Sequence, residues 1–170
     1  MKRFIPILFV FFIVGCYDVA LDLPDHIKKI YIQPAVNKTF EYELEEDVTR
    51  AIREEFLADG RLIVVDKKED ADALLETTIT KYILQPLAFD VNRNPTENRI
   101  VIYTLFRFID KVEGRELWND DTLYGQTTFS KIKIPPETET DARLRAAKDL
   151  AILAANRVLE GWETISRTER

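Results

Sequence analysis

The sequence has few of the side chains on which enzyme chemistry usually depends. Its 170 residues include one cysteine, one histidine and five glycines. It contains no G-x-S-x-G, H-E-x-x-H or glycine-rich phosphate-binding motif. The single histidine, His26, has no cysteine or second histidine with which to share a metal ion or form a catalytic triad. We therefore expect no enzymatic activity, no cofactor and no metal site, and we expect His26 to be an exposed loop residue.

Positive charge is also scarce. The 24 lysine and arginine residues are outnumbered by 30 aspartate and glutamate residues, and they form no long basic run. Proteins that bind nucleic acid usually carry a basic stripe that offsets the phosphate charge, so we exclude nucleic acid as a partner. The acidic clusters at 43–47 and 69–72 lie at a predicted helix start and in a predicted turn. Acidic residues are common in such places for structural reasons, and we do not expect an acid/base pair there.

Long hydrophobic runs are missing except at the N-terminus. Lys2 and Arg3 precede an apolar stretch from Phe4 to Val14, which is typical of a signal peptide. The stretch is shorter than the roughly 20 residues that a membrane-spanning helix needs. It ends in Ile13-Val14-Gly15-Cys16, which resembles a lipobox, the signal for lipid attachment to the cysteine. Because lipidation accounts for an otherwise unpaired thiol, we expect Cys16 to carry a lipid; the alternative is a signal peptide cut nearby that leaves a free thiol.

These features divide the chain into four parts. We expect residues 1–15 to be a removed signal peptide, 16–26 a lipidated tether, 27–162 a single domain and 163–170 a polar tail. Removing Lys2 and Arg3 leaves 22 basic against 30 acidic side chains, a net charge near −8. An acidic residue directly after a lipidated cysteine is the usual inner-membrane retention signal. Tyr17 stands there instead, which favours the outer membrane, although Asp18 follows it.

Hydrophobic periodicity predicts two helices and five strands. The predicted helices span 43–58 and 141–159, the second capped by Thr138 or Thr140. Their expected buried stripes are Leu44, Val48, Ala51, Ile52, Phe56 and Leu57 in the first, and Leu144, Ala147, Ala151, Ala154, Val158 and Trp162 in the second. The predicted strands span 27–33, 62–65, 73–84, 99–109 and 116–129, with a loop over 85–95.

The order β-α-β-β-β-β-α indicates an α+β fold. We expect a two-layer sandwich in which both helices pack on one face of a mixed sheet of four to five strands. The first strand, helix and second strand should form a right-handed βαβ unit with parallel or neighbouring strands.

The predicted strand at 99–109 is apolar on both faces. Ile100, Ile102, Phe106 and Phe108 share one face, whereas Val101, Tyr103, Leu105 and Ile109 share the other. An apolar face that the chain's own helices do not cover suggests a second protein or a lipid against it; the alternative is burial under loops and the tether. Val101, Tyr103 and Leu105 are therefore candidate partner-facing residues.

Several phrases of the sequence, taken in order, resemble the LptE family of lipopolysaccharide-assembly lipoproteins. They lie at residues 27–32, 37–40, 54–62, 71–76, 114–118 and 159–162. The resemblance covers nearly all of the expected mature chain. It implies that the protein sits as a plug within the lumen of a large outer-membrane β-barrel, LptD, and helps it to fold and to deliver lipopolysaccharide to the outer leaflet.

The resemblance also implies contact with lipopolysaccharide, whose phosphates call for basic side chains at one end of the sheet. The candidates are Arg93 and Arg99 between the long strands, and Lys131 and Lys133 after the last strand. No motif fixes these positions, and solvated surface charge is the alternative.

A different class of periplasmic lipoprotein is the main alternative to the LptE family. Secretion-channel subunits and cell-wall-synthase activators share a strand-helix-strand opening, and such a protein would oligomerise or regulate a partner. Their loop after the first strand is usually richer in glycine and phenylalanine than the phrase at 37–40.

Overall fold

The computed structural model describes residues 23–160, so the expected signal peptide, Cys16, Trp162 and the polar tail lie outside the described residues. The elements follow in the order β1 (Lys29–Ile32), β2 (Val36–Asn37), α1 (Leu44–Asp59), β3 (Ile63–Val65), the 3-10 helix η1 (Lys68–Asp70), β4 (Ala73–Phe89), β5 (Pro95–Asp110), β6 (Arg115–Asp120), β7 (Tyr124–Ser130) and α2 (Glu139–Glu160). Within residues 23–160 we find no helix with the length and apolarity needed to cross a membrane.

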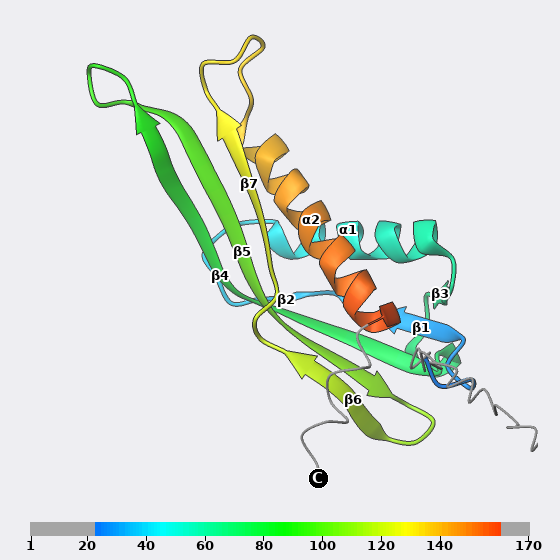
Figure 1. Ribbon diagram of the computed structural model, residues 1–170. Helices are drawn as coiled ribbons and strands as arrows, with labels where there is room; N and C mark the ends of the chain where they lie inside the picture. Colours follow the sequence, from blue (N-terminus) through cyan, green and yellow to red (C-terminus); the bar gives the residue numbers. More distant parts are fainter. Residues whose placement is uncertain (1–22, 161–170) are drawn as a thin grey trace, which may run out of the picture.

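Both long helices lie on one face of a single mixed sheet, which curls around them as a half-barrel (Figure 1). The strands follow the order β3-β1-β4-β5-β6, with β2 beside β4 and β7 beside β5. β1 runs parallel to β3 and to β4, while β4, β5, β6 and β7 pair in antiparallel fashion. This arrangement confirms the predicted α+β fold and the parallel pairing of the first two predicted strands.

The helix α1 ends at Gly60, as its glycine suggests. Gly60 adopts a φ of 74°, and its N–H donates to the carbonyl of Phe56 at 3.1 Å. Glycine takes this left-handed conformation without a steric penalty. The predicted stripe is buried except at Ala51, which is partly buried, and at Leu57, which is 60% exposed. Successive side chains of a helix point in directions that differ by about 100°. Leu57 therefore points away from the buried face on which Phe56 lies.

The long β4–β5 hairpin corrects the predicted loop over 85–95. β4 continues to Phe89 and β5 begins at Pro95, so residues 90–94 alone connect them. Two prolines had favoured a loop, but both positions tolerate them. β2 pairs with β4 at Thr78 and Ile79, so in the described chain the outer part of β4 is an edge strand, where proline such as Pro86 is allowed. Pro95 is the first residue of its strand, where an N–H is not needed.

The predicted strand at 116–129 is two strands. β6 pairs with the last part of β5, from Phe106 to Asp110, and β7 pairs with its first part, from Glu97 to Tyr103. The break between them is held by Asp120, whose carboxylate accepts hydrogen bonds from the N–H and hydroxyl of Thr122 at 2.8 and 2.6 Å. Short polar side chains that bond to the backbone two residues on favour a turn over a continuous strand.

The helix α2 packs closely against β7 through small residues. Its buried side consists of Ala142, Ala146, Ala147, Leu150, Ala151, Ala154, Ala155, Val158 and Leu159. Leu144, which we expected in this stripe, is instead 38% exposed. Side chains of α2 also cover the free edge of β7: Asp149 accepts the N–H of Gln126 at 3.1 Å, and Arg145 donates to the carbonyl of Thr128 at 2.8 Å. An edge capped in this way cannot pair with another strand.

Candidate functional site

One end of the domain brings together two segments that are distant in sequence. Residues 84–99, around the β4–β5 turn, and residues 130–138, between β7 and α2, project side by side in Figure 1. The N–H of Lys131 donates to the carbonyl of Thr96 at 3.0 Å, and Glu97 is paired with Ser130. We call this part of the molecule the hairpin end.

Three of the four predicted lipopolysaccharide-contacting residues lie in the loops of the hairpin end. Arg93, Lys131 and Lys133 are exposed, and within residues 23–160 none of them makes an ion pair with an acidic side chain. Arg93 has a φ of 65° in a turn organised by Asp90, which accepts the N–H groups of Asn92 and Asn94, both at 2.8 Å. The pKa of the Asp90 carboxyl is held below its usual range, chiefly by hydrogen bonds from Asn94 and to a smaller extent by the one from Asn92. The turn therefore presents Arg93 to solvent.

Arg99, the fourth predicted contact, lies apart from these loops. It is half-buried on β5, where it pairs with Gln85 and Thr128 across the sheet. A shallow hollow of about 250 Å³ is lined by Arg99, Gln126, Thr127 and Thr128. The structure thus places Arg99 on the sheet, on the side facing away from the helices, four residues from the start of β5.

The acidic residues of the hairpin end are largely engaged. Asp90 bonds to its own turn, and Glu137 pairs with Arg145 at 2.5 Å. Glu97 is half-buried in β5. Residues 84–99 and 130–138 contain four basic and three acidic side chains, so this end has a small local excess of positive charge although the whole chain carries a net charge of −6. Such a cluster can bind phosphate or carboxylate groups through charge-assisted hydrogen bonds.

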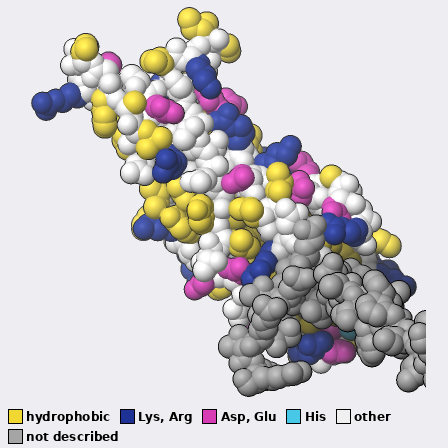
Figure 2. All heavy atoms as spheres, in the orientation of Figure 1, with side chains coloured by type: hydrophobic (Ala, Val, Ile, Leu, Met, Phe, Trp, Pro, Cys, Tyr) yellow, Lys and Arg dark blue, Asp and Glu magenta, His cyan; other side chains and the backbone are white. Residues whose placement is uncertain are grey.

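Large apolar side chains project between these cations. The exposed ones are Leu84 (41%), Leu87 (38%), Phe89 (58%), Val91 (99%), Ile132 (72%) and Ile134 (98%). In Figure 2 both projections at the top carry hydrophobic side chains together with Lys or Arg side chains. We did not predict these residues, because residues 85–95 read as a loop. The signal in the sequence was the period-two spacing of Leu87, Phe89 and Val91, and the alternation of Lys131 and Lys133 with Ile132 and Ile134.

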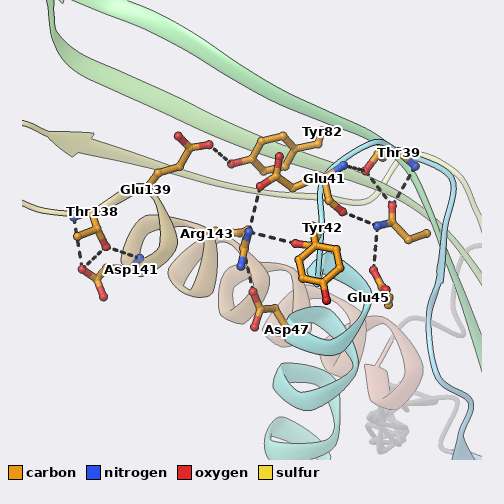
Figure 3. Close-up of polar contacts among 11 residues, drawn as sticks. Thr39, Glu41, Tyr42, Glu45, Asp47, Tyr82, Thr138, Glu139, Asp141 and Arg143 are labelled. Carbon is orange, nitrogen blue, oxygen red and sulfur yellow. Dashed lines mark hydrogen bonds and ion pairs between the residues drawn. The ribbon is translucent and has the colours of Figure 1, made fainter.

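A set of hydrogen bonds fixes the hairpin end relative to α2. Thr138 caps the helix: its hydroxyl accepts the N–H of Asp141 at 3.1 Å and donates to the Asp141 carboxylate at 2.6 Å (Figure 3). This confirms Thr138 over Thr140 as the cap. The hydroxyl of Tyr82 on β4 donates to Glu139 at 3.0 Å. Burial, followed by the bond to Glu139, raises the pKa of Tyr82, so it stays a donor.

Arg143 joins α2 to α1 at the centre of this network. Its guanidinium donates to Asp47 at 2.8 Å, to Glu41 at 3.0 Å and to the carbonyl of Tyr42 at 3.3 Å (Figure 3). Burial lowers the pKa of Arg143, but Asp47 and Glu41 outweigh it and raise the pKa overall. Asp47 belongs to an acidic cluster that we assigned to a helix start. It is only 7% exposed, and it binds both this arginine and Arg50, whose guanidinium lies 2.6 Å from it.

The predicted partner face lies on the side of the sheet away from the helices. Ile100, Ile102, Phe106 and Phe108 belong to the hydrophobic core, whereas Val101, Tyr103, Leu105 and Ile109 do not. Val101 is 7% exposed, and Tyr103 and Leu105 are half-buried. The rings of Tyr103 and Tyr124 lie 5.5 Å apart on this face. Tyr103 is also paired with Lys81, which adds one cation to the face.

His26 lies in a turn, as we expected, but its side chain makes a contact that we did not predict. Its side chain is 34% exposed, and its Nε2 lies 2.7 Å from the carboxylate of the fully buried Asp110. The two residues are 84 positions apart, so sequence spacing gave no sign of the contact. It lies at the far end of β5 from the hairpin end.

Comparisons with solved structures bear on the fold. The chain is 14% identical to a PelC dodecamer from Paraburkholderia phytofirmans, with a TM-score of 0.54 and coverage of 78% of this chain and 90% of that one. It is 9% identical to the hypothetical protein CT253 from Chlamydia trachomatis, with a TM-score of 0.55 and coverage of 79% of this chain and 97% of that one. The rare lipoprotein B from Shewanella oneidensis matches with 14% identity, a TM-score of 0.41 and coverage of 75% and 89%. At such low identities the first two show a shared fold alone.

Comparisons of sequence give the family. None of the curated proteins matches the chain. The model of the family described as LptE, lipopolysaccharide-assembly, matches residues 27–160, which confirms the resemblance seen in the order of the sequence phrases. Its members are non-catalytic assembly lipoproteins, in agreement with the expected lack of enzymatic activity. The chain therefore belongs to the LptE family of lipopolysaccharide-assembly proteins.

Proposed function

We propose that this protein is an outer-membrane lipoprotein, anchored through Cys16, that plugs an LptD-like β-barrel, assists its folding and passes lipopolysaccharide to the outer leaflet. Family membership implies the role in lipopolysaccharide assembly; the barrel partner, the anchor and the contact residues are our proposal. The observation that carries it is the hairpin end, where unpaired cations and exposed apolar side chains meet.

The chemistry of the hairpin end suits the lipid portion of lipopolysaccharide. That portion combines phosphate groups with acyl chains. Arg93, Lys131 and Lys133 supply unpaired donors for the phosphates, and Val91 and Ile134, at 99% and 98% exposure, supply apolar contacts. Hydrogen bonds to charged groups contribute about 1.5–3 kcal/mol each. Three of them offset the repulsion that an overall acidic protein exerts on an anion.

A direct binding measurement tests this part of the proposal. The full-length protein in detergent is titrated with lipopolysaccharide, and the variant Arg93→Ala/Lys131→Ala/Lys133→Ala is compared with it. We expect affinity to fall roughly 10- to 100-fold, the equivalent of one or two charged contacts. The control Lys28→Ala/Lys29→Ala/Lys67→Ala removes the same charge from exposed residues at the other end. Equal losses in the two triple variants would mean that net charge, and not the hairpin end, governs binding.

The partner-facing role rests on the apolar side of the sheet that is turned away from the helices. Tyr103, Leu105 and Tyr124 give it partly exposed aromatic and aliphatic side chains on rigid strands. Side chains of this kind often anchor protein interfaces because little conformational entropy is lost when they bind. A barrel wall that contacts this face would cover what α1 and α2 leave open.

A pull-down from outer membranes in mild detergent, with mass spectrometry of the stoichiometric partner, tests the barrel. One large β-barrel protein at one to one would support the plug. Recovery of a large homo-oligomer alone would favour the secretion-channel class instead. The 14% identity to PelC is too low to favour that class by itself. Tyr103→Ser/Leu105→Ser should lose the barrel. The matched control Ile152→Ser/Leu153→Ser alters α2 residues that are 38% and 39% exposed and should retain it.

The anchor has its own test. Cys16→Ser should move the protein from the membrane to the soluble fraction after osmotic shock, and the wild-type intact mass should exceed that of the polypeptide by an attached lipid. A wild-type protein whose mass shows a free thiol would remove the anchor from the proposal.

A further inference from the structure

Three metal-ligating side chains lie together at the end of the domain opposite the hairpin end. They are His26, which precedes β1, Asp110, the last residue of β5, and Glu113 in the β5–β6 turn; their nearest ligand atoms all lie within 4.8 Å of one another. We propose that they form a binding site for one divalent transition-metal ion, Zn²⁺. This proposal does not rest on the function proposed above.

Asp110 is already held as a metal ligand is usually held. Its side chain is fully buried, and its Oδ1 accepts the N–H groups of Val112 and Glu113 at 2.8 and 2.9 Å. Oδ2 faces His26 Nε2 at 2.7 Å. The two backbone hydrogen bonds therefore orient the carboxylate before a cation arrives, which is the part that outer-shell hydrogen bonds play for metal ligands in general.

Glu113 completes the set from the surface. One of its oxygens, Oε2, accepts a hydrogen bond from Arg115 Nε at 2.5 Å, which leaves the other oxygen for a metal ion. Arg115 then plays the orienting part for Glu113 that the backbone plays for Asp110. Lys111, the remaining cation of this turn, points elsewhere: its Nζ donates to the carbonyls of Lys68 and Ala71.

The donor set selects the metal. One imidazole nitrogen and two carboxylate oxygens suit Zn²⁺, which takes N and O ligands at about 2.0–2.2 Å in a four-coordinate site. Ca²⁺ and Mg²⁺ prefer oxygen alone. The ion would replace the proton between His26 Nε2 and Asp110 Oδ2. The 2.7 Å between these atoms must then widen to roughly 3.3 Å, the separation of two ligands in a tetrahedral site. With water in the fourth position, the coordination is complete.

Binding would join segments that are far apart in the chain. His26 belongs to the segment between the expected lipid anchor and β1, while Asp110 and Glu113 belong to a hairpin 84 or more residues later. An ion bound to the folded protein and not to the unfolded chain stabilises the fold by mass action. Zn²⁺ would therefore clamp the start of the domain to its longest strand pair.

Titration with zinc chloride tests the site. The full-length protein in detergent, purified without a histidine tag and stripped with EDTA, is followed by calorimetry, with Co²⁺ as the absorbing probe. We expect one Zn²⁺ per chain and the visible bands of four-coordinate Co²⁺. Glu113→Gln and His26→Gln should each weaken binding at least about tenfold, since even the loss of an outer-shell group costs roughly 10- to 100-fold.

The controls keep the result decisive. Glu113 is exposed and makes no bond to His26, so Glu113→Gln should leave the fold and the His26–Asp110 contact in place. Glu69→Gln removes an exposed carboxylate from η1 at the same end and should leave affinity unchanged. Absence of saturable Zn²⁺ binding to the wild type, or equal affinity in the wild type and Glu113→Gln, would overturn the proposal.

Discussion

Replacing Gly125 by alanine should displace α2 from the sheet. A Cβ atom at this position would lie 2.1 Å from the carbonyl oxygen of Ala146, 2.7 Å from the Cβ of Leu150 and 2.8 Å from its nitrogen. Two of these atoms belong to the helix backbone, so no side-chain rotation relieves the clash. Since ordinary contact begins at 3.4 Å, α2 must retreat by at least about 1.3 Å.

The cost follows from what that movement breaks. Overpacking of a tight core costs about 1–3 kcal/mol. Retreat of α2 also stretches the bonds from Gln126 to Asp149 and from Arg145 to Thr128, and a lost bond to a charged group costs about 1.5 kcal/mol or more. We expect unfolding free energy to fall by about 3–5 kcal/mol. For a domain of this size the melting temperature should drop by roughly 10 °C.

Thermal unfolding followed by circular dichroism measures this effect, with Gly60→Ala as the matched control. Gly60 has a φ of 74°, and a Cβ atom added to it would meet no other atom within 4 Å. Its alanine variant therefore suffers backbone strain of about 1–2 kcal/mol and no clash. If Gly125→Ala lost no more stability than Gly60→Ala, the close packing of α2 on β7 would be wrong.

Three further changes test other contacts. Arg143→Ala removes one of the two arginines that bind Asp47, while Arg50 stays paired with this carboxylate at 2.6 Å. The lost charged hydrogen bonds should cost about 1.5–3 kcal/mol in urea unfolding, and a loss below about 1 kcal/mol would contradict a buried contact. Thr138→Ala should cost about 1 kcal/mol through the lost helix cap, whereas Thr140→Ala should cost almost nothing. The folded-state pKa of Asp110 is lowered, so its stabilisation is complete above the unfolded value of about 3.9 and is lost as pH falls through the folded value. Asp110→Asn should flatten the stability profile below about pH 4, and a slope equal to that of the wild type would refute this role.

The first half of the fold follows from local signals. The apolar spacing of α1 and Gly60 at its end depend on contacts within a few residues, and the structure agrees to within one residue at each end. The parallel pairing of β1 and β3 follows from the short connection through one helix. Patterns of this range are visible in a single sequence because each residue's environment is set by its near neighbours.

The hairpin end and the His26 cluster depend on distant contacts instead. Residues 85–89 form a strand because they pair with β5. Pro86 is tolerated among them because, in the described sheet, no strand pairs with the other edge of β4 beyond Ile79. His26 gains its environment from Asp110, 84 positions away. We could predict the basic residues at the hairpin end from their types, but not the apolar ones, because their exposure depends on how far the hairpin projects.

The length of the long strands gives the two ends different tasks in the proposed complex. β5 has 16 residues, which at roughly 3.3 Å per residue span about 50 Å before the curl of the sheet shortens them. A bilayer with its headgroups is about 40–45 Å thick. A domain tethered at its His26 end to the inner leaflet, and lying upright in a barrel, would therefore bring Arg93 and Lys131 close to the outer leaflet. Substitutions at the His26 end should then change stability and leave lipopolysaccharide affinity unchanged. Substitutions at the hairpin end should change lipopolysaccharide affinity and leave stability unchanged. A variant at either end that changed both properties equally would show that the two ends are coupled.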